Sequence, residues 1–373
     1  MPSNRRFALT VSPLCCAMAA AMKRPVLSPD FLAALALRLL AVVNLLFALA
    51  FLATLLLVSQ ARAEAPACTG RDLLAQLETE EPAAHARLRA EAAAVLNGSH
   101  LLWTVEKPGI APSFLFGTMH LTDPRVTELT DAARTAYESA GTVVIETTDV
   151  LDQAKMMAVL IERPDLMMYT DGSSLTSSLP PDKVRTIEDA LSARGIPPAS
   201  VSKMKPWMLA ATLSMPACEN ARKAAGMPIL DIKLAQDAKA QGKAVAGLEN
   251  MIDQFDAMAS LPLAFHIDGL IATLELGDKI DDVFETMVVL YAREDVGMIW
   301  PLFREVLPEG EAGAYEAFER VMIDARNATM RDNSIPFLDA GGAFIAVGAL
   351  HLPGERGLVE MLRAAGYTVS PAG

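Results

Sequence analysis

Hydrophobic residues form two kinds of pattern after residue 68. Short apolar runs bounded by turn residues occur at 101–105, 113–116, 142–145, 243–246, 344–347 and 367–369, and such runs are typical of strands. Residues 70–97, 123–139 and 354–365 have helical spacing, as do 150–160, 181–194, 205–217, 228–241 and 250–335. Breaks in the last stretch are predicted near Leu261-Pro262, at Leu307-Pro-Glu-Gly310 and at Ile335-Pro336. The pattern predicts one α/β domain over 64–373. Its central mixed sheet comes from the first and last parts, and a large helical middle spans about 150–335.

Two of the predicted strands end in the same short motif. Phe116-Gly-Thr-Met-His120 follows one strand and Val347-Gly-Ala-Leu-His351 follows another, so each strand is followed by Gly-x-x-His. The glycines mark sharp turns or close approaches. Each histidine falls just past a strand end, where open α/β sheets bind their ligands. The repetition predicts two related halves that face each other, with an internal duplication as one origin.

Acidic residues end two further strands. Glu146 follows 142–145, and Glu249 follows 243–246 after Gly247-Leu248. If these strands lie side by side with those before His120 and His351, two imidazoles and two carboxylates meet at one edge, a set suited to a first-row metal. A carboxylate left over is a candidate general base. Each residue also has a plain alternative as a helix cap or a loop hydrogen bond.

The charge and the remaining motifs exclude other classes of function. The net charge is −13 and the pI about 4.9, which argues against a nucleic-acid partner because phosphate binding requires clustered Lys and Arg. No Gly-x-Ser-x-Gly elbow and no phosphate-binding Gly-x-x-x-x-Gly-Lys loop occurs. His266, within an apolar helical run, is expected to be a core residue.

The first 63 residues are predicted to be a targeting segment. They carry six basic residues and one acidic residue, and 31–58 is almost wholly apolar. Ala61-Arg62-Ala63 fits a signal-peptidase site. The alternative is an uncleaved N-terminal anchor, since this stretch is long enough to span a bilayer. Either way we expect export to the periplasm, or an inner-membrane protein whose domain faces the periplasm and which meets the membrane only through this segment.

Export changes the expectation for the cysteines. Only Cys68 and Cys218 follow residue 63. In an oxidising compartment a lone pair of cysteines favours a disulfide over two free thiols. The sequence therefore predicts that the start of the mature chain is tied to a helical segment.

The motifs together resemble the TraB/GumN family, which also contains PrgY and the animal Tiki proteins. The resemblance rests on Phe116–His120, Val144–Glu146, Gly247–Glu249, Arg326-Asn327 with Met330, and Val347–Glu355. It implies an α/β fold with a helical insertion, related to the erythromycin-esterase and ChaN-like proteins. The Tiki members are metal-dependent peptidases supported by manganese or cobalt. Zinc is a further candidate for this chain.

The resemblance places the functional residues at His120, His351 and Glu146, which are predicted to bind the metal or activate water. Three roles are open for Arg326: it orients a carboxylate, it binds a substrate oxyanion, or it forms a structural ion pair. Glu249 is expected to support the site. The leading hypothesis is an exported metal-dependent hydrolase of a peptide or amide bond. Two alternatives are open: an envelope protein that binds or sequesters a peptide without cleaving it, and an esterase-like hydrolase without metal. The sequence leaves open the substrate, which is a peptide or a small molecule, and the oligomeric state.

Overall fold

The computed structural model describes residues 38–40, 42–47, 49–51, 68–306 and 314–372. Contacts divide the chain into two units, Met1–Glu64 and Ala65–Gly373, and the second contains every strand discussed below. Most of the predicted targeting segment, including Ala61-Arg62-Ala63, lies outside the described residues. Within them, no single helix is long and apolar enough to cross a membrane. One pair of consecutive helices, Met251–Ala259 and Leu263–Leu276, is together long and apolar enough for a membrane span, but the two helices are bent by 94° at the break between them.

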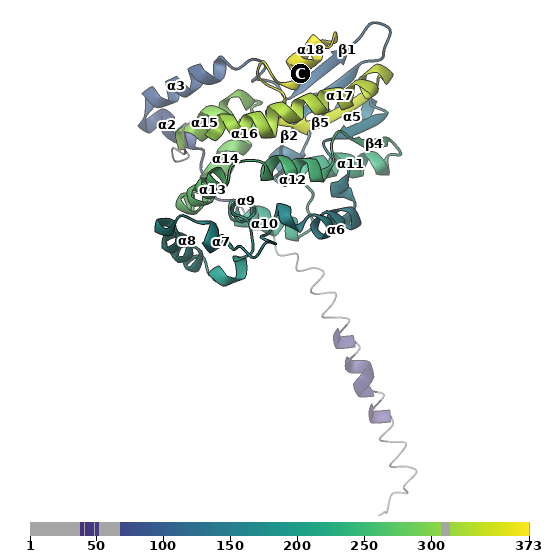
Figure 1. The fold of residues 1–373 in the computed structure, drawn as a ribbon. Coiled ribbons are helices and arrows are strands. Elements are labelled where there is room, and N and C mark those ends of the chain that lie inside the picture. Colours follow the sequence, from purple (N-terminus) through teal and green to yellow (C-terminus); the bar gives the residue numbers. More distant parts are fainter. Residues whose placement is uncertain (1–37, 41, 48, 52–67, 307–313, 373) are drawn as a thin grey trace, which may run out of the picture. The chain divides into compact units, whose positions relative to one another are not determined.

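A six-stranded mixed sheet forms the centre of the second unit, in the order β4-β3-β5-β2-β1-β6 (Figure 1). The strands are β1 (Leu102–Glu106), β2 (Ser113–Thr118), β3 (Thr142–Ile145), β4 (Ala244–Gly247), β5 (Ala343–Gly348) and β6 (Thr368–Pro371). The four strands β4, β3, β5 and β2 run parallel. The hairpin β1–β2 and the pair β1–β6 are antiparallel. The predicted α/β fold and mixed sheet are therefore confirmed.

Helices account for most of the remaining chain. Their bounds are α2 (Leu73–Glu80), α3 (Pro82–Ala93), α4 (Pro124–Thr127), α5 (Asp131–Ser139), α6 (Gln153–Glu162), α7 (Leu175–Ser178), α8 (Pro181–Ala193), α9 (Pro206–Leu213), α10 (Ala217–Ala224), α11 (Leu230–Ala240), α12 (Met251–Ala259), α13 (Leu263–Leu276), α14 (Lys279–Ala292), α15 (Ile299–Val306), α16 (Ala314–Phe318), α17 (Ala325–Ala340) and α18 (Leu358–Ala364). A π-helical turn, η5 (Glu319–Asp324), leads directly into α17, and single 3-10 turns include η1 (Asp149–Leu151) and η6 (Ala349–His351).

Proline positions explain where the observed helices differ from the predicted ones. The predicted helix over 70–97 is two helices, because Pro82 starts α3, and proline is favoured at the first helical position. The break predicted at Ile335-Pro336 is wrong, since Pro336 lies inside α17. Met330 and Leu338 on either side of it are buried in the core. Packing of that face outweighs the one backbone hydrogen bond that proline removes.

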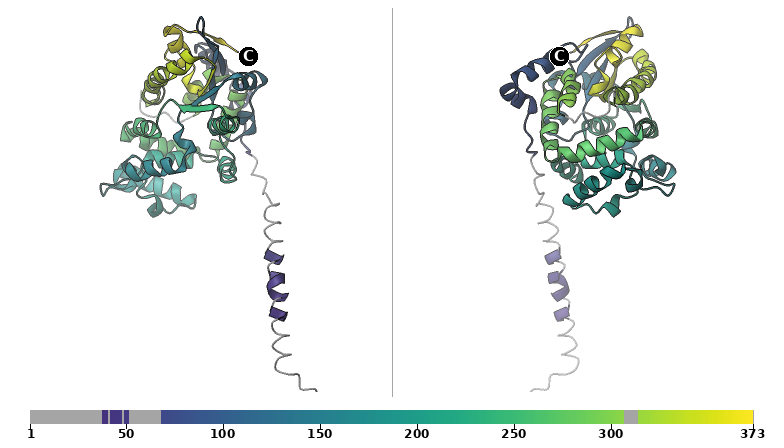
Figure 2. Two further views of the ribbon diagram at one scale, coloured as in Figure 1. Left: turned by 90° about the vertical axis from the view of Figure 1, so that its right-hand side faces the viewer. Right: turned by 60° about the vertical axis from the view of Figure 1, so that its left-hand side comes forward.

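The two faces of the sheet carry separate hydrophobic layers, which lie beneath the helices drawn in Figure 2. Phe344 and Ala346 of β5 belong to a cluster that includes Tyr137 of α5 and Leu234 of α11. Ile345 and Val347 belong to a second cluster with residues of α17 and α18. This alternation follows from the two-residue period of a strand. A strand buried on both faces explains why β5 is an uninterrupted apolar run.

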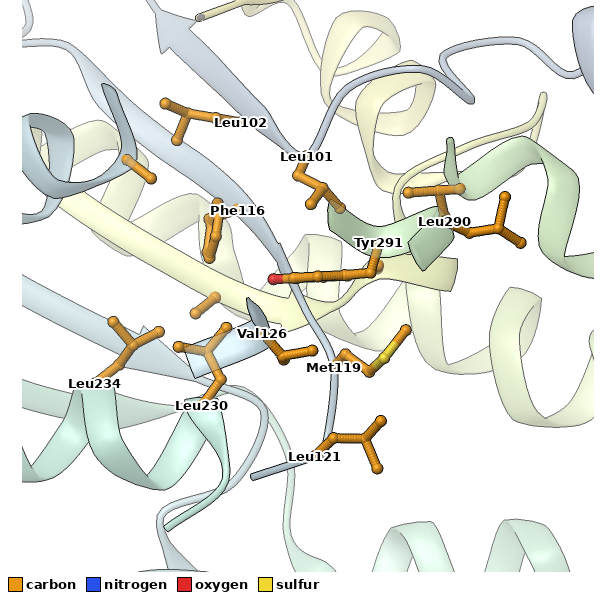
Figure 3. Close-up of a cluster of buried hydrophobic side chains, with 14 of the residues drawn as sticks. Leu101, Leu102, Phe116, Met119, Leu121, Val126, Leu230, Leu234, Leu290 and Tyr291 are labelled. Atoms are coloured by element: carbon orange, nitrogen blue, oxygen red, sulfur yellow. The ribbon is translucent and has the colours of Figure 1, made fainter. Parts of the chain in front are cut away.

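The first cluster reaches the turn that precedes His120. Figure 3 shows Tyr291 of α14 lying beside Phe116 and Met119, and its hydroxyl donates a hydrogen bond of 2.8 Å to the carbonyl of Gly117. Burial raises the pKa of Tyr291 far above its usual range. The end of β2 is therefore fixed by a buried hydrogen bond from the helical middle. His266 is buried, with Nε2 3.0 Å from the Met258 carbonyl, as expected of a core histidine.

Candidate functional site

The four parallel strands bring the four predicted polar residues to one edge of the sheet. His120, Glu146, Glu249 and His351 follow β2, β3, β4 and β5, which are neighbours in the sheet. Parallel strands end at the same edge, so each side chain enters the loops beyond that edge. The structure thus places at one sheet edge four side chains that span 231 positions in the sequence, from His120 to His351.

Both motif glycines allow close contact between loops. A Cβ atom at Gly117 would lie 2.8 Å from Leu352 Cδ1 and 3.1 Å from Ala349 Cα, so the first motif packs directly on the second. A Cβ at Gly348 would lie 3.1 Å from Glu146 Oε1 and 3.4 Å from His351 Cδ2. The two glycines leave space for the neighbouring motif and for the Glu146 carboxylate.

Glu146 occupies the centre of the cluster. Its Oε1 accepts a hydrogen bond of 2.6 Å from the Gly348 N–H, and its Oε2 accepts one of 2.6 Å from Arg326. The Gln254 amide adds a bond of 3.3 Å to Oε2. Burial alone would raise the pKa of Glu146, but the charges of His351, His120 and Arg326 hold it at about 2. Glu146 is therefore ionised at neutral pH.

Arg326 joins Glu146 to Glu249. Its Nη2 lies 2.7 Å from Glu249 Oε2, and its Nε lies 3.0 Å from the same oxygen. The side chains of Arg326 and Glu249 are 12% and 3% exposed. Burial raises the pKa of Glu249, and the Arg326 charge opposes that shift. One guanidinium thus pairs with two buried carboxylates, which lowers the cost of keeping their charge away from water.

His351 is oriented by the residue after Arg326. Its Nδ1 lies 2.7 Å from Asn327 Oδ1, while the Asn327 amide nitrogen donates to the Arg356 carbonyl at 2.8 Å. That second bond assigns the Asn327 oxygen to His351, so Nδ1 carries the proton and the Nε2 lone pair is unprotonated. Nε2 accepts a long hydrogen bond of 3.4 Å from Arg326 Nη1. Nε2 lies 3.9 Å from Glu146 Oε1. Burial lowers the pKa of His351 to about 4, although the Glu146 charge opposes the shift.

His120 has a carboxylate partner that the sequence did not single out. Its Nδ1 lies 2.9 Å from Asp231 Oδ2, and Asp231 Oδ1 accepts a hydrogen bond of 2.6 Å from the Thr118 hydroxyl. Partial desolvation opposes the charged ring, but the charge and hydrogen bond of Asp231 raise the pKa of His120 to about 9. The ring is 56% exposed, so solvent screens part of this attraction, but the direction of the shift is upward.

A second carboxylate holds the loop that follows His120. Glu219 of α10 accepts hydrogen bonds from the Thr122 backbone and hydroxyl, at 3.0 and 2.8 Å. Arg222 pairs with Glu219 and with Asp123, whose pKa is lowered against burial by Arg125 and Arg222. The neighbouring Cys218 is bonded to Cys68. The predicted disulfide is confirmed, and it ties α10 to the start of the folded unit.

Sequence reasoning missed Asp231, Gln254 and Glu219 as residues around the site. Asp231 stands in the first turn of a predicted helix, where an acidic residue is ordinary, so its position gave no signal of contact with His120. Asn327 follows Arg326 directly, and only the fold shows that its amide orients His351. The signal available in the sequence was a polar residue within an otherwise apolar segment, such as Asp231 between Leu230 and Ile232.

The donor types suit a divalent cation, but a complete set of ligands is not assembled. Within the described ranges, no group of three or more His, Cys, Asp and Glu side chains is arranged to hold a metal ion. His351 Nε2 and Glu146 Oε1 form a pair beside the space left by Gly348, and the charge of His120 acts on both. Imidazole and carboxylate suit first-row metals. Two of the three predicted ligands therefore lie close together, and Arg326 contacts both of them.

Comparison with known proteins gives a family and distant relatives. The model of the TraB/PrgY/gumN family matches residues 101–371. The chain is 23% identical over 327 residues to Metalloprotease TIKI2 of Danio rerio, covering 72% of this chain and 60% of the relative. It is 24% identical over 321 residues to Metalloprotease TIKI1 of Danio rerio, covering 73% and 63%. It thus spans less than two thirds of these relatives. No solved structure matches the chain.

Proposed function

The chain belongs to the TraB/PrgY/gumN family, and from this we propose that it is an exported metal-dependent hydrolase that cleaves a peptide or amide bond. The observation that carries the proposal is the pair His351 and Glu146, whose Nε2 and Oε1 atoms face each other at 3.9 Å in a buried place. The relatives named as metalloproteases support hydrolysis as the class of reaction.

His120, Glu146 and His351 are the residues that would hold the metal, with manganese, cobalt or zinc as candidates. A metal held there would lower the pKa of bound water and polarise a substrate carbonyl. His351 offers an unprotonated Nε2 at neutral pH, because its pKa is about 4. His120 keeps its Nδ1 proton toward Asp231. Because the pKa of His120 is raised to about 9, Nε2 also carries a proton at neutral pH and has to lose it before it can bind a metal, which couples metal binding to proton release.

Glu249 and Arg326 have supporting roles in this proposal. Arg326 holds both carboxylates at 2.6–2.7 Å, so it fixes the orientation of Glu146 while leaving the Oε1 atom on the His351 side. Glu249 is the carboxylate of the site that is not assigned to the metal. Its raised pKa suits a group that exchanges a proton with the substrate.

Metal analysis and product analysis of the purified chain test this function. We expect about one equivalent of metal per chain, bound by ligands near 2 Å, and cleavage of peptides in a mixed pool detected by mass spectrometry. His120→Ala and His351→Ala should remove cleavage, while His85→Ala, on helix α3 near the start of the folded unit, should retain it. Unchanged metal content and activity in both site variants would contradict the proposal.

The same assay separates two other candidate functions. The His120–Asp231 pair favours, as a second candidate, a hydrolase without metal, because a charged exposed imidazole can give a proton to a leaving group. Cleavage that survives chelation would support it. An envelope protein that only sequesters a peptide would return the peptide intact.

Export to the periplasm, with the N-terminal segment as signal peptide or anchor, is part of the proposal. The Cys68–Cys218 disulfide supports it, because disulfides persist in oxidising compartments. Mass spectrometry of the mature N-terminus distinguishes a cleaved signal peptide from a retained anchor.

The parallel neighbours β2 and β5, each followed by Gly-x-x-His, support a duplicated half and a kinship with the erythromycin-esterase and ChaN-like folds.

A further inference from the structure

The strand β4 has one free edge. It is the last strand of the sheet (Figure 1), and its residues alternate in direction. Ala244 N–H bonds to the Gly141 carbonyl and Leu248 N–H to the Ile145 carbonyl, so these residues face β3. Val245 and Gly247 lie between the residues that face β3, so their N–H and C=O groups point to the other side. Within the described residues, no hydrogen bond to those outward groups is present.

A wide, solvent-open surface cavity of about 790 Å³ lies against this edge. Its lining includes Val245 of β4, Thr148 and Leu151 of the segment after β3, Met157 and Lys155 of α6, and Lys239 of α11. Unpaired backbone groups at a sheet edge recruit an extended chain as an additional strand. The cavity supplies the room that such a strand and its side chains need.

The side chains around the cavity indicate which peptide it fits. Met157 is 48% exposed, and an exposed flexible thioether accommodates varied apolar side chains. Lys239 forms no ion pair among the described residues, and Lys155 is 61% exposed and only 3.4 Å from Asp149. Asp152 also lines the cavity, but its carboxylate caps α6 through Ala154 and Lys155 N–H. Lys239 is therefore the cation at this cavity that has no ion-pair partner among the described residues, and it is the group that an acidic side chain of a ligand would meet.

The edge leads directly to the candidate site. Gly247 is two residues before Glu249, and a Cβ at Gly247 would lie 2.9 Å from Thr148 N, which places the ends of β3 and β4 in contact. Thr148 is two residues after Glu146. A strand paired with Val245 and Gly247 would thus run to the edge where Glu146 and Glu249 lie.

We propose that the outer edge of β4 binds an extended segment of the substrate as a seventh strand, with apolar side chains on Met157 and an acidic side chain toward Lys239. This inference rests on the proposed peptide hydrolysis and identifies where the peptide is held and which sequence it prefers.

A proline at position 245 tests the backbone contact. Val245 N–H points away from β3, so Val245→Pro removes the donor without breaking the β3–β4 pairing, and proline is tolerated in edge strands. The probe is a fluorescein-labelled octapeptide of alternating Val and Ser with one Glu, measured by anisotropy with chelator-treated protein. Losing one backbone bond should weaken binding about three- to tenfold. Val245→Ala, which keeps the N–H, should stay nearer to the unchanged protein.

Two further measurements do not depend on that variant. N-methylation of the octapeptide at odd or at even positions should weaken binding in one set only, because alternate residues of a strand face the neighbour. Lys239→Glu should weaken the Glu-containing peptide about two- to fivefold and favour a Lys-containing one. Equal effects of both methylation patterns, or binding unchanged by Val245→Pro in a protein with unaltered thermal unfolding, would overturn the inference.

The outcomes separate this inference from the proposed function. If the peptide binds in a manner sensitive to Val245→Pro but returns intact from the metal-loaded protein, the β4 site stands and hydrolysis fails. If peptides are cleaved with equal KM by the Val245→Pro and unchanged proteins, hydrolysis stands and the β4 site fails. A dimer in sedimentation that Val245→Pro dissociates, with peptide binding unaltered, would assign the edge to a second copy and overturn the inference.

Discussion

Asp231 Oδ2 lies 2.9 Å from His120 Nδ1, and the exposed imidazole is thereby held by a buried carboxylate. The two residues come from the loop after β2 and from α11. A histidine held through one ring nitrogen presents the other in a fixed direction, which is the usual way proteins orient an imidazole for metal binding or proton transfer. Asp231 is therefore a positioning residue for His120.

Asp231→Asn should lower the pKa of His120 from about 9 toward its ordinary value, because the partner charge is removed. A raised histidine pKa adds stability that is complete below the unfolded value of about 6.5 and is lost as the pH rises through the folded value. The stability difference between the unchanged protein and the variant should thus be largest below about pH 6.5 and shrink through about pH 9. Imidazole NMR titration and urea unfolding of metal-free protein measure both quantities.

The control for this variant is Asp237→Asn on the same helix, since Asp237 pairs with Lys233 and is 46% exposed. It should leave the His120 titration unchanged. Activity of Asp231→Asn should fall about 10- to 100-fold, as with other groups that orient a ligand. A pKa of His120 unaltered by Asp231→Asn would contradict the positioning role.

Arg326→Met should destabilise the fold by about 3–5 kcal/mol, because it leaves Glu146 and Glu249 buried without their cation. Adding Glu249→Gln should restore part of the loss by removing one of the unpaired charges. Arg331→Met, on the same helix with an exposed partner in Asp332, should cost under about 1 kcal/mol. Denaturant unfolding compares the three variants, and equal losses for Arg326→Met and Arg331→Met would refute this account of Arg326.

Gly348→Ala should reduce activity with little cost to the backbone. Gly348 has φ −52°, which alanine adopts freely, but the added methyl would lie 3.1 Å from Glu146 Oε1. The carboxylate has to shift, and we expect a stability loss of about 1–3 kcal/mol typical of overpacking with a larger loss of kcat. Gly141→Ala, where a Cβ meets nothing within 4 Å, is the control. Equal kinetics for the two variants would show that the space beside Glu146 is not needed.

Cys68→Ala with Cys218→Ala should lower the free energy of unfolding by about 2–4 kcal/mol, since the disulfide closes a long loop in the unfolded chain. The disulfide joins two residues that are 150 positions apart in the sequence. A second effect is expected in the loop after His120, because α10 holds Thr122 through Glu219. Hydrogen exchange at Thr122 should rise in the variant. Unaltered exchange there would mean that Glu219 holds the loop without help from the disulfide.

The sequence by itself determined the strands and the residues at their ends. Apolar runs of strand length predicted β1 to β5 within a few positions, because burial on both faces leaves β3 and β5 almost no polar residues. The repeated Gly-x-x-His and the two glutamates drew attention to His120, Glu146, Glu249 and His351. Local patterns of this kind depend only on neighbouring residues, so they are readable without a fold.

Only the tertiary structure decided which side chains meet. Strand order cannot be read from the runs, so the sequence did not show that β3 and β5 are neighbours or that β4 is a free edge. Asp231 reaches His120, and Asn327 reaches His351, across 111 and 24 positions. Such contacts depend on how helices pack on the sheet. Packing also kept α17 intact through Pro336, because the buried face of that helix outweighs one missing hydrogen bond.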